Sequence, residues 1–268
     1  MTGAREDLEP RSGTSREAVR ATSSIHELLA DLALEGTAGT VVDLGAGKGP
    51  TLAEIARRSP DSALTALDVD ESALAQLALR LPEARIVRHD LADPLPLPDA
   101  GIDVVVSHNT LECLTEPAAL VADIARVLRP GGRAVLGHTD FETIAVTVDD
   151  RDLARRVLLT YAELPVPYQH MAAADPQTGR RLPGLIRRSP LHLEAVHAHT
   201  TVVATLPEAM DLRLREVHTA VRRSTERGLG HVTTKETDAW LDQLHAAETT
   251  GDFLFSETAF VVTASRPT

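Results

Sequence analysis

Val41-Val-Asp-Leu-Gly-Ala-Gly-Lys-Gly49, followed by Pro50-Thr-Leu-Ala-Glu-Ile-Ala-Arg-Arg58, is the stretch of sequence that decides the fold. A short β-rich run ends at Asp43, a turn with three glycines follows, and Pro50 opens a helical pattern. Proline suits the first position of a helix because its missing N–H would have no partner there. A strand, a glycine turn and a helix in this order allow a backbone to approach a nucleotide closely. The stretch therefore predicts a parallel α/β fold with a nucleotide-type site at the end of this strand.

The glycine spacing differs from the dinucleotide fingerprint, which would require glycine where Pro50 stands. Asp43 is more informative, because a carboxylate at the end of the strand repels a pyrophosphate and attracts a positively charged ligand. S-adenosylmethionine carries a sulfonium and an ammonium and has no phosphate. Asp43 thus favours S-adenosylmethionine over NAD, although a tight strand-to-helix turn without a ligand would give the same pattern.

Further strands and acidic strand ends follow along the chain. Asp68 ends the next strand about twenty residues after the glycine turn, where an acidic group can bind ribose hydroxyls. The fourth strand is a near-continuous apolar run, as expected for a strand that is buried on both faces. The strands expected after the first are Ala63–Val69, Arg85–Asp90, Ile102–Ser107, Arg133–Gly137, Leu193–Leu206 and Phe253–Ser265.

With these motifs the chain resembles the class I S-adenosylmethionine-dependent methyltransferases of the small-molecule type. The resemblance is close over residues 20 to 140 and loose over the C-terminal strands. It departs from the family at Cys113, where relatives often have histidine after the Leu-Glu that follows the fourth strand. The five matching motifs occur in the family's order and are Val41–Gly49, Leu67–Asp70, His89–Leu91, Ile102–Leu114 and Leu128–Arg133.

The resemblance implies a role for each residue at the strand ends. Asp43, with the backbone of Gly45 and Gly47, would line the methionine end of the cofactor, and Asp68 would bind its ribose.

The adenine side of the implied site continues along the next two strands. Val69 would pack against adenine, Asp90 would accept a hydrogen bond from its amino group, and Leu91 would close the edge of the pocket. Ser107 and His108, at the end of the fourth strand, would lie near the sulfonium.

The acceptor is expected under a lid of helices inserted at residues 139–190 and 207–250. Methyl transfer needs an in-line approach to the methyl group, and a base is needed only where the acceptor must lose a proton. His138 directly follows the fifth strand on the ligand side of the sheet, and histidine suits such a base, although it could instead cap a loop. The predicted catalytic residues are His138, Tyr161, Tyr168 and His108, and further acceptor-site candidates are Asp140 and His170.

Composition limits the class of partner. A net charge of −12 argues against nonspecific nucleic-acid binding, which needs clustered Lys and Arg, even though Arg180-Arg181 and Arg187-Arg188 could form a local patch. The single cysteine suits a reducing compartment, and no stretch of eighteen apolar residues is present. His192, His197 and His199 lack partners at metal-ligand spacing, so no metal is expected. We expect a cytoplasmic protein, monomeric or homodimeric, that binds neither nucleic acid nor membrane.

These observations predict a doubly wound α/β fold with a mostly parallel, seven-stranded, Rossmann-like sheet. Residues 1–14 are expected to be a disordered tail and residues 15–268 a single methyltransferase domain, with its cofactor-binding half at 40–137. The predicted function is methyl transfer from S-adenosylmethionine to an oxygen or nitrogen atom of a small molecule in bacterial specialised metabolism. Two alternatives stay open: a non-methylating, cyclase-type enzyme that binds the same cofactor, and a regulatory partner subunit.

Overall fold

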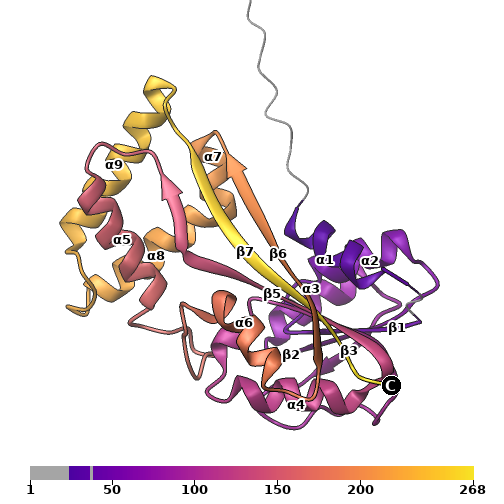
Figure 1. Ribbon diagram of the computed structural model, residues 1–268. Coiled ribbons are helices and arrows are strands. Elements are labelled where there is room, and N and C mark those ends of the chain that lie inside the picture. Colours follow the sequence, from indigo (N-terminus) through magenta and orange to yellow (C-terminus); the bar gives the residue numbers. More distant parts are fainter. Residues whose placement is uncertain (1–23, 37–38) are drawn as a thin grey trace, which may run out of the picture.

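The computed structural model describes residues 24–36 and 39–268 and shows a seven-stranded mixed sheet in the order β3-β2-β1-β4-β5-β7-β6 (Figure 1). The first five strands of this order pair in parallel, and β7 pairs antiparallel with both β5 and β6. The predicted fold class, a doubly wound and mostly parallel sheet with flanking helices, is confirmed. The strands are β1 (Thr40–Leu44), β2 (Ala63–Asp68), β3 (Arg85–Arg88), β4 (Ile102–His108), β5 (Leu128–Val146), β6 (His192–Val203) and β7 (Phe255–Ser265).

Helices cover both faces of the parallel half of the sheet. Apolar side chains of α1, α2 and α3 form one buried cluster against it, and α4 and α6 pack on the opposite face. Strands buried on both faces read as continuous apolar runs, which is why β1 and β4 were visible in the sequence. The helical elements are α1 (Ile25–Ala33), α2 (Pro50–Arg58), α3 (Glu71–Arg80), η1 (Leu111–Cys113), α4 (Pro117–Val127), α5 (Arg151–Glu163), α6 (Thr178–Arg187), α7 (Leu206–Ala209), η2 (Met210–Leu214), α8 (Arg215–Thr225) and α9 (Thr234–Thr250).

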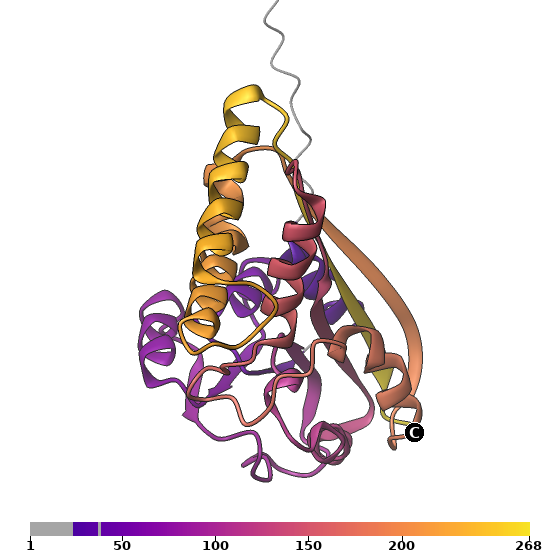
Figure 2. The same cartoon turned by 90° about the vertical axis from the view of Figure 1, so that its left-hand side faces the viewer.

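The far ends of β5, β6 and β7 leave the layered part of the molecule and carry a second helical group. In Figure 2, α5 and α9 stand in front of these long strands. Their side chains, with those of α8, form a separate buried cluster around Trp240 and Phe255, both of which are fully buried. This second cluster places α5 and η2–α8 beyond the carboxyl ends of the parallel strands, where ligands bind on open α/β sheets.

β5 is much longer than the predicted strand Arg133–Gly137. His138 and Asp140 were expected to follow the end of this strand, but both are buried within β5 and pair with β7. The antiparallel pairing of β5 with β7 continues to Val146. A shift of register between Asp140 and Ala145 bends the strand at this point. The start of the predicted lid segment is therefore strand, and its helices begin only at α5.

Other boundaries differ less from the prediction. The first part of the helical insertion predicted at 207–250 is divided into α7, the π-helical turn η2 and α8. The predicted sixth strand ends at Val203 rather than Leu206, because Leu206 is the first residue of α7, which Pro207 helps to start. The predicted disordered tail, residues 1–14, lies outside the described residues.

Candidate functional site

A cavity of about 120 Å³ lies at the carboxyl ends of β1, β2 and β3. It is smaller than the roughly 300–1,000 Å³ of drug-sized binding sites, so a whole nucleoside ligand would extend beyond it. The structure brings five of the eight predicted cofactor residues together in its wall, namely Gly45, Asp68, Val69, Asp90 and Leu91.

The glycine turn has the conformation that a close ligand needs. Gly45 adopts a φ of +73°, and an added Cβ would lie 2.1 Å from Oγ1 of Thr110, so no larger residue fits there. Gly47 also has positive φ, but a Cβ built on it would meet no atom within 4 Å. Gly47 therefore faces open space beside the cavity, as expected for a backbone that a ligand approaches.

Asp68 connects the glycine turn to the next helix. Its Oδ2 accepts a hydrogen bond of 2.7 Å from the backbone N–H of Gly47, and its Oδ1 accepts one of 2.8 Å from Asp70 N. Asp70 in turn caps α3 by accepting from the N–H groups of Ser72 and Ala73. The carboxylate that lines the cavity is thus held in place by backbone donors.

Asp43 and Ser107 are buried, and neither is among the residues that line this cavity. The hydroxyl of Ser107 donates a hydrogen bond of 2.7 Å to the carbonyl oxygen of Leu44 and so connects β4 with β1. Asp43 is 3% exposed. Burial, followed by the negative charge of Asp68, raises the pKa of Asp43 to about 7.

We predict that S-adenosylmethionine binding strengthens as pH rises from 5 to 7. The free protein holds a proton on Asp43 below its pKa of about 7, whereas a nearby cation favours the ionised carboxylate. Binding would then release this proton, so the dissociation constant falls by up to about tenfold per pH unit and becomes constant above pH 7. Calorimetry between pH 5 and 8 measures this slope.

The matched variant is Asp43→Asn, which keeps the shape of the side chain and cannot ionise. It should bind more weakly at pH 7 and show no such slope. An unchanged slope in this variant would assign the pH dependence to another group.

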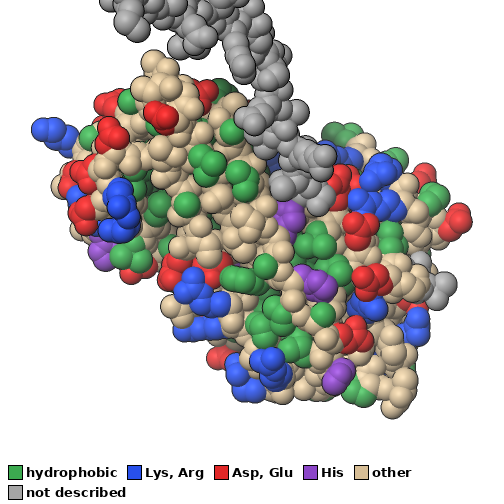
Figure 3. Space-filling view, turned by 45° about the horizontal axis from the view of Figure 1, so that its top comes forward, with side chains coloured by type: hydrophobic (Ala, Val, Ile, Leu, Met, Phe, Trp, Pro, Cys, Tyr) green, Lys and Arg blue, Asp and Glu red, His purple; other side chains and the backbone are tan. Residues whose placement is uncertain are grey.

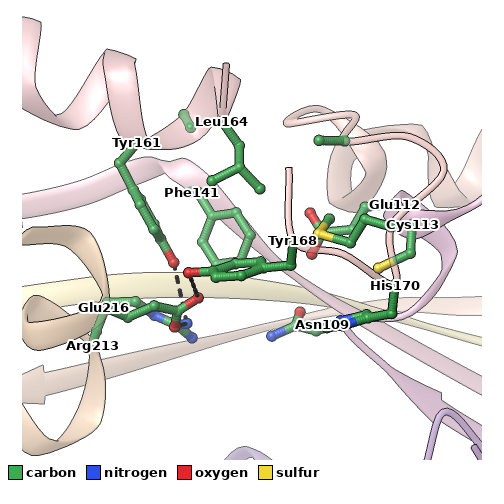
Figure 4. Close-up of a pocket in the computed structure, with 13 residues that line it drawn as sticks. Asn109, Glu112, Cys113, Phe141, Tyr161, Leu164, Tyr168, His170, Arg213 and Glu216 are labelled. Carbon is green, nitrogen blue, oxygen red and sulfur yellow. Dashed lines mark hydrogen bonds and ion pairs between the residues drawn. The ribbon is translucent and has the colours of Figure 1, made fainter. Parts of the chain in front are cut away.

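A second cavity, of about 510 Å³, adjoins the first (Figure 4). Its wall combines the turn after β4 with side chains from β5, α5, the following loop, η2 and α8. Three of the predicted acceptor residues, Tyr161, Tyr168 and His170, line it. The other lining residues are Asn109, Glu112, Cys113, Phe141, Ala162, Leu164, Met171, Ala174, Arg213 and Glu216.

The two cavities meet at Asn109, Cys113 and His170, which line both. Asn109 has a φ of +53°, a conformation that is uncommon outside glycine and that is found at functional sites when the surroundings hold it. Two hydrogen bonds with Thr139 hold it: Thr139 N donates to Oδ1 at 2.7 Å, and Nδ2 donates to Oγ1 at 3.3 Å. The turn after β4 is therefore fixed where the two cavities join.

A partly buried polar network closes the far side of the second cavity. The hydroxyl of Tyr168 donates to Oε1 of Glu216 at 3.2 Å, and Nη1 of Arg213 donates to Tyr161 at 3.4 Å and to Glu216 at 2.9 Å. Burial, followed by the charge of Glu216, raises the pKa of Tyr168 to about 12, and burial raises the pKa of Tyr161. Both phenols are therefore protonated at neutral pH and can act as hydrogen-bond donors rather than as bases.

His138 lies behind the wall of this cavity. Its side chain is 1% exposed, its Nδ1 is 2.6 Å from the carbonyl oxygen of Thr139, and its Nε2 is 3.2 Å from Oε2 of Glu112. Nε2 of His138 and Oε2 of Glu112 are close enough for an ion pair, but their geometry is not that of a hydrogen bond. Asp140 is also buried, and Arg180 binds it with two hydrogen bonds. Glu112 lines the cavity, whereas His138 and Asp140 do not.

His108 lines a third cavity, of about 610 Å³, beside α1 and the ends of β6 and β7. Its ring packs edge-to-face on His26, with centroids 5.4 Å apart, and burial followed by His26 holds its pKa well below the usual value. Asn109 and Arg213 form the boundary between the 610 Å³ cavity and the 510 Å³ cavity, since both residues line each of them. The four predicted catalytic residues thus do not share one site. Tyr161 and Tyr168 line the 510 Å³ cavity, His108 lines the 610 Å³ cavity, and His138 lies behind Glu112.

The sequence of this chain is similar to that of a known domain family. Residues 42–136 match the family described as a methyltransferase domain. This segment of the chain is a methyltransferase domain. The matched segment of this domain runs from β1 to β5 and contains the glycine turn, Asp68, Asp90 and the turn at Asn109. S-adenosylmethionine is the cofactor of this family, and the open space at Gly47 with the acidic strand ends fits it.

Three proteins with similar sequences come from bacteria. An uncharacterised 37.1 kDa protein in a transposon of Streptomyces fradiae is 29% identical over 84% of this chain and 62% of its own length. A probable S-adenosylmethionine-dependent methyltransferase of Mycolicibacterium smegmatis is 41% identical over 34% of this chain and 35% of its own length. A trans-aconitate 2-methyltransferase of Paracidovorax citrulli is 33% identical over 41% of this chain and 42% of its own length. The matches span less than two thirds of each of these relatives.

A similar solved structure is that of a candidate methyltransferase from Bacillus halodurans C-125. It superposes with a TM-score of 0.59 over 91% of this chain and 99% of its own, at 16% identity, which shows that the fold is shared. No helix in the described part of the chain is long and apolar enough to cross a membrane. On the face shown in Figure 3, acidic and basic side chains are interspersed. The expected absence of nucleic acid among the partners stays a prediction.

Proposed function

We propose that this protein transfers a methyl group from S-adenosylmethionine to a small molecule held in the 510 Å³ cavity. The observation that carries this proposal is the junction of two cavities at Asn109, Cys113 and His170. One cavity has the acidic strand ends of the cofactor site, and the other has a volume typical of small-molecule sites. The trans-aconitate methyltransferase among the relatives also supports a small-molecule acceptor.

In this proposal the cofactor spans the junction. Asp68 would bind the ribose hydroxyls, Asp90 and Leu91 would bound the adenine, and the ionised Asp43 would favour the positive methionine end. The methyl group would then lie beside Asn109, at the entrance to the second cavity.

Residues 139–190 and 207–250 would form the walls around the acceptor. Their cavity-lining side chains come from β5, α5, the following loop and η2–α8. Such walls would position the acceptor and exclude water, from which much of the rate of methyl transfer can come. An acceptor atom of oxygen or nitrogen, and a role in bacterial specialised metabolism, remain part of the proposal.

The first test compares two nucleotide ligands by thermal shift. S-adenosylhomocysteine should raise the melting temperature, because a ligand that binds only the native state stabilises it by about 2.7 kcal/mol at a hundred times its dissociation constant. NADH should not raise it, since Asp43 and Pro50 do not suit a pyrophosphate. Stabilisation by NADH alone would contradict the proposal.

A second measurement separates methyl transfer from the two alternatives. A methyltransferase forms S-adenosylhomocysteine in proportion to the methylated acceptor, whereas a cyclase-type enzyme or a regulatory subunit binds the cofactor without consuming it. Incubation with S-adenosylmethionine and an acceptor panel, followed by mass spectrometry of both products, distinguishes these cases.

A further inference from the structure

Arg213 is the one arginine in the described wall of the acceptor cavity, and four of the five N–H donors of its guanidinium are already used. Nε and Nη2 donate to Glu257 at 2.8 and 3.4 Å, and Nη1 donates to Glu216 at 2.9 Å and to the hydroxyl of Tyr161. The guanidinium also stacks over Phe141, 5.0 Å from the ring centroid. An acceptor carboxylate would therefore have to compete with two carboxylates of the protein for this cation.

The carboxylate of Glu112, unlike the guanidinium of Arg213, has few polar partners. Its side chain is 12% exposed and lines the cavity from η1, and the polar contact that the described structure gives its carboxylate is Nε2 of His138 at 3.2 Å. A carboxylate can accept about four hydrogen bonds, so most of its capacity is open. Glu216, by comparison, accepts from both Tyr168 and Arg213.

The formal charges around the cavity leave one negative charge in excess. Among the lining residues, Glu112 and Glu216 carry two negative charges and Arg213 carries one positive charge. Outside the lining, Glu257 and Arg223, whose guanidinium stacks over Tyr168 at 4.4 Å, add one charge of each sign. His138 lies behind Glu112 and adds a positive charge only when it is protonated. Since Arg213 holds both Glu216 and Glu257, the carboxylate with open capacity is Glu112.

The remainder of the wall is apolar and aromatic. Figure 4 shows the rings of Phe141, Tyr161 and Tyr168 grouped across the cavity from Glu112 and Cys113. Aromatic surfaces accommodate organic cations as well as apolar groups. The apolar wall residues are Ala162, Leu164, Met171 and Ala174.

We propose that the acceptor is an amine with an apolar or aromatic body, and that its ammonium binds to Glu112. This inference rests on the proposed function, because it names the substrate class of the same site. Glu112 belongs to the same turn as Asn109 and Cys113, which line both cavities, so the amine nitrogen would lie on the side where the cofactor enters.

The same carboxylate can accept the proton that an ammonium must lose before it reacts. The proton moves from nitrogen to Glu112, and the freed lone pair forms the N–C bond to the methyl carbon. The S–C bond breaks, and its electron pair stays on sulfur. The products are a methylated ammonium, the protonated carboxyl group of Glu112 and neutral S-adenosylhomocysteine, so charge and atoms balance.

The test uses matched ligands on the full chain saturated with S-adenosylhomocysteine. Two sets share their skeletons: tryptamine, tryptophol and indole-3-propionate, and 2-phenylethylamine, 2-phenylethanol and 3-phenylpropanoate. We expect the amines to raise the melting temperature at millimolar concentration and to bind at least tenfold more tightly than the alcohols, with no binding of the carboxylates. Absence of binding by both amines, or equal binding by an alcohol or carboxylate, overturns the inference.

Two variants locate the binding. Glu112→Gln should bind the amine at least tenfold more weakly and keep its affinity for S-adenosylhomocysteine, which shows that the variant is folded. Glu163→Gln is the control, because Glu163 also pairs with a histidine, His231, at 2.7 Å but lies outside the cavity. Equal amine affinity in Glu112→Gln and the parent overturns the inference, whereas loss of S-adenosylhomocysteine binding by the parent would instead contradict the proposed function.

Discussion

Replacement of Arg213 by alanine is expected to lower the free energy of unfolding by about 3–5 kcal/mol, the cost of breaking a buried ion pair from one side. Arg213 joins η2 to β7 through Glu257, whose side chain is 8% exposed. Removal of the guanidinium would leave this carboxylate buried without a cation, and Glu216 and Tyr161 would also lose a partner. Urea denaturation monitored by circular dichroism measures the loss.

Two further variants show whether the effect comes from burial. Arg215→Ala removes an arginine two residues along the chain that pairs with Asp211 at the surface, where both side chains are more than half exposed, and should cost no more than about 1 kcal/mol. The double variant Arg213→Met, Glu257→Gln removes both charges and should recover much of the stability. Equal losses in Arg213→Ala and Arg215→Ala would show that the buried pair contributes little.

The proposed cofactor side of the site could be predicted because its residues lie at strand ends. Each parallel strand delivers its last residue to the same edge of the sheet, so Asp68, Asp90 and the glycine turn converge without any knowledge of distant contacts. Asp43 and Ser107 were identified by the same reasoning. The structure adds that both side chains are buried outside the cavity lining, and that the hydroxyl of Ser107 bonds to Leu44.

The acceptor cavity could be predicted only in part, because its wall depends on long-range packing. Tyr161 and Tyr168 stood out as the two tyrosines of the inserted segment. Arg213 and Glu216 belong to a segment that looked like an ordinary amphipathic helix, and their spacing of three residues resembles a surface ion pair. Nothing in the sequence shows that Glu257, on the last strand, completes the pair in the interior.

The surroundings of His138 depend on the pairing of β5 with β7, more than a hundred residues later in the chain. A strand that ended at Gly137 would release His138 into a loop that faces the ligand. Pairing with Phe260 instead continues the strand and places the ring behind Glu112. Glu112 itself could have been noticed as the acidic residue that directly precedes Cys113, where the family pattern changes.

Asp68→Ala is expected to weaken S-adenosylmethionine binding by about 1.5–3 kcal/mol, the range for hydrogen bonds that involve a charged group. This corresponds to a loss of about 10- to 150-fold in affinity. Two contributions act in the same direction. The carboxylate lines the cavity where ribose hydroxyls would bind, and it also holds the N–H of Gly47, so the variant would loosen the turn that faces the cofactor. Titration calorimetry gives the affinity, and thermal denaturation shows whether the fold is intact.

Asp70→Ala separates a cofactor contact from a general disturbance of this region. Asp70 is two residues away and caps α3, so its loss should cost about 1 kcal/mol of stability and leave cofactor affinity nearly unchanged. Asp68→Asn keeps one acceptor oxygen and the shape of the side chain, and should fall between Asp68→Ala and the parent protein. If Asp68→Ala folds normally and binds the cofactor as tightly as the parent, Asp68 is not part of the binding site.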